Sequence, residues 1–224
     1  MDNTKRANLL WPQRLSDMVH SVLEEAIVSG KLQPGQKIYE DQIAEELGVS
    51  TTPVREAITR LKREGLVSWQ YHRSPSVKVF SKRDVIEIYD LRGALESLAV
   101  RLAAENLTDE ELDALNATQI MGEEHIAAGD LMSYAVKSNE AFHSALIEAA
   151  NNGRLSAMMR TIQAQSECLT AATVRIPGAP KRSIAEHRSI IKALRDKDVS
   201  TAQAITKAHI QRAKLDMLDS LRED

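Results

Sequence analysis

Cysteine, aromatic residues and long apolar runs are all scarce in this sequence of 224 residues. Cys168 is the single cysteine, which excludes an internal disulfide and a cluster of thiolate metal ligands. Aromatic residues make up 4% of the chain, which favours helices packed with aliphatic side chains over a β-rich fold. No apolar run approaches the roughly 20 residues that span a bilayer, and the first residues lack the apolar core of a signal peptide. We therefore expect a cytoplasmic protein with no membrane partner.

A net positive charge is also lacking, since the formal net charge is −3. The charge is unevenly distributed, however. Residues 1–80 contain 11 Lys and Arg against 10 Asp and Glu, whereas the remainder contains 18 against 22. Basic side chains gather locally at Arg55, Arg60, Lys62, Arg63 and Arg73. The overall charge therefore does not exclude nucleic acid as a partner, but it predicts a modest non-specific affinity that two protomers would have to reinforce.

Two short helices joined by a tight turn are predicted between residues 40 and 63. Gly48 follows an apolar-periodic run and suits the left-handed residue that closes a helix. Ser50 is placed to cap the next helix, which begins at Thr51, by accepting hydrogen bonds from the amides of its first turn. Pro53 falls at the third helical position, where its missing N–H costs no intrahelical bond.

The second of these helices has one apolar face and one polar face. The apolar face repeats at helical spacing and comprises Val54, Ala57, Ile58 and Leu61. The opposite face is polar and basic and comprises Thr52, Arg55, Thr59 and Lys62. Short hydroxyl side chains near a helix start, followed one turn later by an arginine, suit contact with phosphates and base edges in the major groove. An ordinary helical hairpin with a solvated outer face is the alternative.

A β-hairpin is predicted directly after this helix. Val67, Trp69 and Tyr71 alternate with polar residues, 72–75 resemble a turn, and the alternation resumes at Val77 and Val79. A helix-turn-helix followed by a hairpin is a winged helix. Arg73 lies at the tip of the wing, where it can enter the minor groove or contact phosphate.

The first 80 residues resemble the GntR family of bacterial transcription regulators. The matching motifs are Leu32-Gln33-Pro34-Gly35, Ile43-Ala44-Glu45-Glu46-Leu47-Gly48-Val49-Ser50, Thr52-Pro53-Val54-Arg55-Glu56-Ala57 and Leu61-Lys62-Arg63-Glu64-Gly65-Leu66-Val67. The family usually has arginine where this chain has Thr51 and glycine where it has Ser74. The resemblance implies a DNA-binding domain over residues 1–80 and a homodimer on a palindromic operator. The expected DNA contacts are Ser50, Thr51, Thr52, Arg55, Thr59 and Arg73.

After Phe80 the pattern is helical only. Ser81 with Asp84, and Thr108 with Glu111, have the spacing of capping boxes. Helices are predicted over 81–105, 108–128, 130–151, 154–173, 183–195 and 199–221, with Ser183 and Glu186 capping the fifth. Six helices with short connections are typical of an antiparallel bundle. The predicted fold is therefore mainly α, with a winged helix-turn-helix domain followed by an all-α domain over residues 81–224.

Three histidines and one asparagine of the predicted bundle can meet in its interior. Asn139 and His143 are four residues apart and so lie on the same helix face. His187 and His209 lie on the last two helices. Three imidazoles and an amide oxygen are a suitable donor set for a first-row metal ion. Single histidines on helix faces are more often ordinary core or surface residues, and that interpretation remains open here.

The segment from about Ser81 to the end resembles the FCD domain, the effector-binding domain of the FadR-type subgroup of GntR regulators. The matching residues are Leu91-Arg92, Leu95-Glu96, Asn139-Glu140-Ala141-Phe142-His143, Glu186-His187-Arg188 and His209. The resemblance implies that Asn139, His143, His187 and His209 bind a divalent metal, zinc or nickel, which helps to hold a small carboxylate effector. Asn139 takes the place of the more usual aspartate, so the effector would have to supply the missing negative charge.

Arg92 has two interpretations. Its guanidinium can hold the effector carboxylate in the pocket, or it can form an intrahelical ion pair with Glu96 four residues on.

The sequence thus predicts a metabolite-responsive transcription regulator that performs no catalysis. A metal-dependent hydrolase that uses the histidine site is the first alternative. Helix geometry predicts that Glu140 and Glu186 point away from the ligand face, which leaves the hydrolase without an evident general base. A dimerisation module with a metal-free interior is the second alternative.

Overall fold

The computed structural model describes residues 3–70 and 73–221, with side chains described from residue 15 onward. The chain divides into two compact units, Met1–Val79 and Phe80–Asp224. Among the described residues, no helix is both long and apolar enough to cross a membrane.

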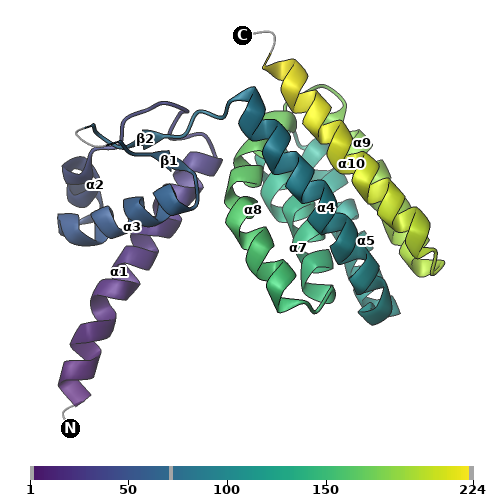
Figure 1. Cartoon of the computed structure of the whole chain (residues 1–224), viewed down its shortest axis with the longest axis horizontal. Helices are drawn as coiled ribbons and strands as arrows, with labels where there is room; N and C mark the ends of the chain where they lie inside the picture. Colours follow the sequence, from purple (N-terminus) through teal and green to yellow (C-terminus); the bar gives the residue numbers. More distant parts are fainter. Residues whose placement is uncertain (1–2, 71–72, 222–224) are drawn as a thin grey trace. The chain divides into compact units, whose positions relative to one another are not determined.

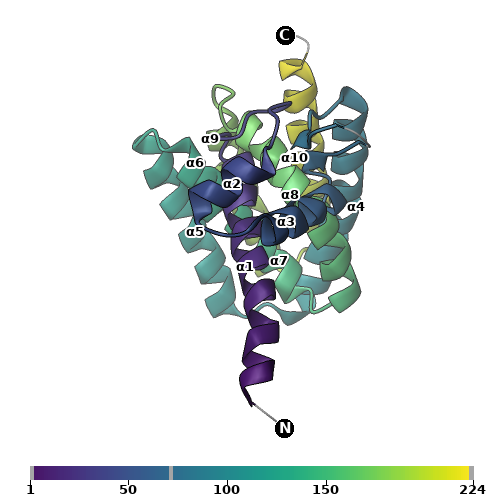
Figure 2. The same cartoon turned by 90° about the vertical axis from the view of Figure 1, so that its left-hand side faces the viewer.

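The N-terminal unit consists of three helices and a two-stranded sheet. The elements are α1 (Asn3–Val28), α2 (Glu40–Leu47), α3 (Thr51–Arg63), β1 (Val67–Ser68) and β2 (Ser76–Val77). Helix α1 packs along α3, which Figure 1 and Figure 2 show from two sides. Helix α1 begins at Asn3. Residues 4–10 are mostly good helix formers, which favours a long helix.

The turn between α2 and α3 follows the prediction at Gly48 but not at Ser50. Gly48 is left-handed, with φ of 65° and ψ of 33°, and closes α2. Ser50 occupies the N-cap position of α3, yet its side chain accepts no hydrogen bond from the first turn that the structure describes. A capping side chain ordinarily bonds the N–H of the second or third helical residue. The predicted side-chain cap is therefore wrong. The third residue is Pro53, which has no N–H and so removes one of the two usual donors.

The wing is present but shorter than predicted. Strands β1 and β2 are antiparallel and place Val67 opposite Val77, both of which are buried. Val79 was expected to continue the buried face but is 61% exposed, because the chain leaves the sheet after Val77. Tyr71 and His72, which the prediction placed at the end of the first strand and in the turn, lie outside the described residues.

In the part of the C-terminal unit that the structure describes, up to residue 221, the regular elements are all helices, which confirms the predicted mainly α fold. Its main helices are α4 (Lys82–Asn106), α5 (Asp109–Ala127), α7 (Glu140–Ala149), α8 (Gly153–Thr173), α9 (Ala179–Arg195) and α10 (Val199–Ser220). Helices α4 and α10 run side by side along much of their length (Figure 1). Both predicted capping boxes are confirmed. The hydroxyls of Ser81 and Thr108 accept hydrogen bonds from backbone amides in the first turns of α4 and α5. In return, the carboxylates of Asp84 and Glu111 accept hydrogen bonds from the backbone amides of the two cap residues.

The predicted helix over 130–151 is interrupted. It consists of a short helix α6 (Leu131–Ser133), a π-helical turn η1 (Tyr134–Asn139) and then α7. A π turn joins each N–H to the carbonyl five residues earlier, and such turns are frequent at functional sites. The turn ends at Asn139, one of the predicted ligands.

Helix α9 begins four residues earlier than predicted. Gly178, with φ of 80°, precedes its first residue, and Pro180 occupies the first turn, where a missing N–H is tolerated. Ser183 is therefore not a cap but an interior helical residue.

These caps lead to a stability prediction. Replacing Thr108 with alanine removes a hydroxyl that bonds a helix amide, so we expect the free energy of unfolding to fall by about 1 kcal/mol. Replacing Ser50 with alanine removes no such bond, so we expect a change within about 0.5 kcal/mol. Urea unfolding of both variants measures the difference. An equal loss in the two would show that the Ser50 hydroxyl caps α3 in solution.

Candidate metal centre and DNA-binding surface

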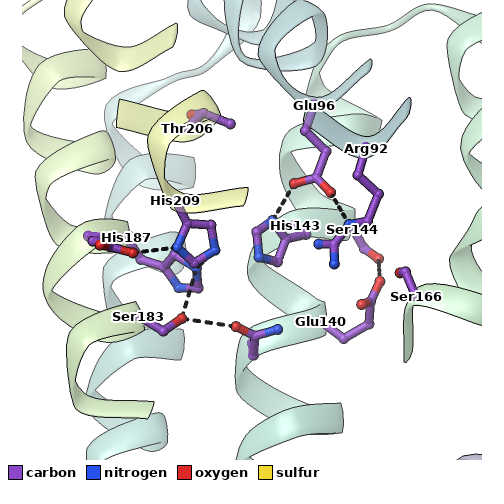
Figure 3. Close-up of polar contacts among 12 residues, drawn as sticks. Arg92, Glu96, Glu140, His143, Ser144, Ser166, Ser183, His187, Thr206 and His209 are labelled. Atoms are coloured by element: carbon purple, nitrogen blue, oxygen red, sulfur yellow. Dashed lines mark hydrogen bonds and ion pairs between the residues drawn. The ribbon is translucent and has the colours of Figure 1, made fainter. Parts of the chain in front are cut away.

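Three histidines from three helices meet inside the C-terminal unit. His143 on α7, His187 on α9 and His209 on α10 are 4%, 0% and 6% exposed. One ring nitrogen of each lies within 4.8 Å of those of the other two. Figure 3 shows the imidazoles around a common centre. The structure therefore brings together the three histidines that the sequence selected.

Each of these imidazoles has a hydrogen-bond acceptor at its Nδ1 atom. The pairs are His143 with Glu96 Oε2 at 2.7 Å, His187 with Gln119 Oε1 at 2.9 Å, and His209 with Glu186 Oε2 at 2.7 Å. The Gln119 amide group is directed to Leu115 and Thr118, which leaves its oxygen for His187. Carboxylate and amide oxygens only accept, so each Nδ1 must bear the proton. Each Nε2 is then left with a lone pair.

The Nε2 atoms of His187 and His209 face each other and are 3.3 Å apart. With both Nδ1 atoms protonated, two lone pairs oppose each other at this distance, which is unfavourable unless a cation lies between them. Two nitrogens bound at about 2.0–2.1 Å to a tetrahedral zinc ion would also lie about 3.3 Å apart. The donor set and its spacing thus fit a divalent metal ion.

The surroundings favour the neutral form of two of these imidazoles, those of His143 and His187. Burial lowers the pKa of His143 and holds the pKa of His187 well below its usual value. Phe142 stacks on the His187 ring, with 3.9 Å between the centroids. A neutral imidazole is the form that binds a metal.

The hydroxyl of Ser183, which was not among the predicted ligands, links Asn139 to His187. Ser183 Oγ donates to Asn139 Oδ1 at 3.2 Å and lies 3.4 Å from His187 Nε2. Asn139 is 7% exposed. Ser183 was assigned to a helix cap, although its spacing of four residues from His187 could have indicated a shared face.

Arg92 forms the intrahelical ion pair that was the alternative interpretation. Its Nε lies 2.7 Å from Glu96 Oε1, and both side chains are 4% exposed. Burial alone would raise the pKa of Glu96, but Arg92 and His143 outweigh it and hold that pKa well below its usual range. Glu96 therefore joins the arginine to the histidine centre (Figure 3).

A small cavity of about 50 Å³ adjoins the centre, and Arg92, Asn139, His143 and His209 contribute to its lining. Two further arginines from α9 and α10 line its more exposed part. Arg182 pairs with Asp216 at 2.8 Å, and Arg212 pairs with Glu186 at 2.6 Å. A cavity of this size accommodates only a small ligand.

The prediction that Glu186 points away from the ligands is wrong. Glu186 bonds both His209 and Arg212, because α10 covers the side of α9 from which it projects. Glu140 accepts hydrogen bonds from Ser144 and Gln163, neither of which is a predicted ligand. Burial, reinforced by Glu167, raises the pKa of Glu140 to about 7.

The polar face of α3 is accessible, as the DNA-binding prediction requires. The predicted apolar face is confirmed, since Val54, Ala57, Ile58 and Leu61 are at most 1% exposed. Among the expected DNA contacts, Ser50, Thr52, Arg55 and Arg73 are exposed, whereas Thr51 and Thr59 are half-buried. Thr59 Oγ1 donates to the backbone oxygen of Arg55 at 2.7 Å, so its proton is engaged within the helix.

Arg55 has a partner that the sequence did not indicate. Its Nε and Nη2 lie 2.9 and 2.6 Å from Glu40 Oε2, at the start of α2. The hydrogen bond and charge of Glu40 raise the pKa of Arg55. The two residues are 15 apart in sequence, and only the packing of α2 on α3 brings them together.

Comparison with known proteins gives two family matches. Residues 15–76 match the model of the bacterial regulatory proteins of the gntR family, and residues 87–212 match that of the FCD domain. The chain is 31% identical over 197 residues to the Nta operon transcriptional regulator of Aminobacter aminovorans, covering 87% of this chain and 90% of that protein. It is 30% identical over 211 residues to the probable D-xylose utilization operon transcriptional repressor of Paenarthrobacter nicotinovorans, covering 94% and 91%.

Two solved structures also resemble this chain over most of its length. E. coli McbR/YncC matches with a TM-score of 0.80 and 26% identity, covering 92% of this chain and 98% of that one. A putative GntR regulator from Rhodococcus matches with a TM-score of 0.77 and 25% identity, covering 91% and 97%. These relatives are transcription regulators, so the comparisons do not favour the hydrolase alternative. The chain belongs to the GntR family and is a bacterial transcription regulator, with a helix-turn-helix domain followed by an FCD domain.

Proposed function

We propose that this regulator binds a palindromic operator as a homodimer and is controlled by a small organic acid that binds with zinc or nickel in the FCD domain. The observation that supports the effector site best is the arrangement of His143, His187 and His209. Each has its Nδ1 engaged by an acceptor, and one ring nitrogen of each lies within 4.8 Å of those of the other two.

The DNA-binding part of the proposal rests on α3 and the wing. Ser50, Thr52 and Arg55 form an exposed polar surface at the start of α3, where helix-turn-helix proteins contact base edges. Arg73 is exposed between β1 and β2 and would contact phosphate or the minor groove. Thr51 and Thr59 are less accessible and would contribute at the edge of the contact. A homodimer would place two such surfaces about one DNA turn apart.

The effector site would use neutral protein ligands. Asn139 and the three histidines would hold the metal, which would supply positive charge for binding a carboxylate. No carboxylate belongs to this ligand set, so the divalent charge would be left for the effector to compensate. Arg92 would stabilise the anion from the cavity wall, although its Nε is already engaged by Glu96.

Control would follow from linkage between the two domains. A ligand shifts an equilibrium only by its difference in affinity for the alternative states. The acid would therefore favour the arrangement of the FCD domain that binds it better, and operator affinity would change by the same coupling factor. Two relatives are named as repressors, the one associated with D-xylose utilization and NanR of Klebsiella aerogenes. On that basis we propose that this protein also represses.

The proposal predicts that Arg55→Ala weakens operator binding. A duplex selected from a random pool by the intact protein provides the operator. We expect the variant to bind it at least about tenfold more weakly, because a bidentate arginine contributes about 1–3 kcal/mol to base discrimination. A mobility-shift titration measures the affinity. Arg83→Ala, which removes an exposed arginine of the FCD domain, is the charge-matched control. Unchanged affinity of Arg55→Ala would remove this residue from operator recognition.

A second prediction concerns metal content. Protein purified without chelator should contain about one zinc or nickel ion per chain, and the double variant His143→Ala/His187→Ala should contain almost none. Elemental analysis measures both. His125→Ala changes a half-buried histidine that bonds Ser138 outside the centre, and it should retain the metal. If the unmodified protein stays metal-free after incubation with zinc and nickel, the metal-free dimerisation module becomes the better account.

A third prediction tests whether the hydrogen bond between Gln119 and His187 strengthens metal binding. Gln119→Leu removes the acceptor at His187 Nδ1 while preserving side-chain volume. Loss of such a supporting bond typically costs 10–100-fold in metal affinity, so we expect zinc to bind about that much more weakly. Competition with a chromophoric chelator measures the change. Gln203→Leu is the control, because Gln203 bonds Ser97 instead of a predicted ligand. Equal zinc affinity in the unmodified protein and Gln119→Leu would contradict the assigned role of Gln119.

A further inference from the structure

We propose that Glu40 is a positioning residue for operator recognition, because it holds the Arg55 guanidinium in the orientation from which that group contacts DNA. The inference rests on the proposed role of Arg55 in the operator contact. It assigns a function in specificity to an acidic side chain that belongs to the other helix of the helix-turn-helix.

The geometry of the pair is specific. Both Nε and Nη2 of Arg55 donate to the same oxygen, Glu40 Oε2, at 2.9 and 2.6 Å. Two bonds to one acceptor fix the plane of the guanidinium as well as its distance from α2. The carboxylate is the more enclosed partner, with 16% of the Glu40 side chain exposed against 63% for Arg55. The more buried Glu40 carboxylate thus restricts the orientation of the exposed Arg55 guanidinium.

The contact leaves the outer edge of the guanidinium available. A guanidinium has five N–H donors, and Glu40 engages one on Nε and one on Nη2. The two donors of Nη1 and the second donor of Nη2 remain. One N–H from each of these nitrogens forms the parallel pair that matches O6 and N7 of a guanine. Arg55 can therefore contact a base in bidentate fashion without leaving Glu40.

Because Glu40 restrains Arg55 before DNA binds, less side-chain entropy is lost on binding. A free arginine side chain loses rotamer freedom when it docks on a base, and restraint in the unbound protein removes part of that loss. The effect falls on the specific contact. Non-specific binding depends mainly on the number of phosphates neutralised and is insensitive to the orientation of one guanidinium.

The charge of Glu40 has the opposite effect, which makes the inference testable. A carboxylate near DNA repels phosphates, so removing a carboxylate that acted only through its charge would strengthen binding to every duplex. Removing a positioning carboxylate should weaken binding to the operator while leaving binding to unrelated duplexes unchanged or slightly stronger. Asp41 is the matched control, because it is the adjacent exposed acidic residue in the first turn of α2.

The experiment compares Glu40→Ala, Glu40→Gln, Asp41→Ala and Arg55→Ala in the full-length protein. Fluorescence anisotropy measures the affinity of each for the selected operator and for an unrelated duplex of equal length. We expect Glu40→Ala to lower the ratio of the two affinities about tenfold, within the range that one bidentate base contact contributes. Asp41→Ala should leave the ratio within about twofold, and Glu40→Gln, which keeps an acceptor oxygen, should fall between them.

The double variant Glu40→Ala/Arg55→Ala shows whether Glu40 acts through Arg55. If it does, the operator affinity of the double variant equals that of Arg55→Ala. A normal ratio in Glu40→Ala, a ratio lowered equally in Asp41→Ala, or a further loss in the double variant would each overturn the inference. If Arg55→Ala itself binds the operator normally, the proposed role of Arg55 fails first. The thermal unfolding midpoint of each variant excludes a general loss of structure.

Discussion

The hydrogen bonds at the three imidazole Nδ1 atoms determine what the FCD domain can bind. Glu96, Gln119 and Glu186 each accept from one histidine, and they do so from three different helices. Each bond fixes both the proton and the ring orientation, which leaves the Nε2 atom of each neutral ring available to a ligand. Packing alone would not select this tautomer. The domain thus directs nitrogen ligand atoms toward one another in its interior, an arrangement that a bound cation would stabilise.

The DNA-binding domain has a similar arrangement, in which one supporting residue orients one contacting residue. Arg55 is the exposed group, and Glu40 on a neighbouring helix engages one edge of it. In both places, a residue one layer behind the contacting group determines how that group is presented. Pro53 adds a related effect, because its missing N–H removes one of the two usual partners of a cap, and the Ser50 side chain does not cap α3. That hydroxyl remains exposed at the start of α3.

Much of the fold could be predicted from sequence, because its determinants are local. Helical periodicity identified the buried face of α3, and the capping boxes at Ser81 and Thr108 identified two helix starts. The π turn that ends at Asn139 could not be predicted, since it is selected by packing against other helices and has no residue pattern of its own. The start of α9 was placed at Ser183 because of its capping spacing with Glu186, whereas the helix begins at Ala179 and has Pro180 in its first turn, where a proline is tolerated.

For the site, sequence reasoning identified the residues that face the centre but few of those that support them. Spacing along one helix linked Asn139 to His143, and the predicted bundle allowed His187 and His209 to meet them in its interior. The family resemblance implied the same four residues. Gln119 bonds His187, which is 68 residues away in the chain, and Ser183 bonds Asn139, which is 44 residues away. No sequence periodicity predicts pairs that are so far apart. The Glu40–Arg55 pair was missed for the same reason.

The central claim is that three Nε2 atoms of the FCD domain form one metal-binding centre. Anomalous diffraction from crystals grown with zinc, recorded on both sides of the zinc absorption edge, tests it most directly. The account predicts one strong peak per chain, within about 2.0–2.1 Å of Nε2 of His143, His187 and His209. A peak bound through Nδ1 of any of these residues, or no peak in the domain interior, would contradict it.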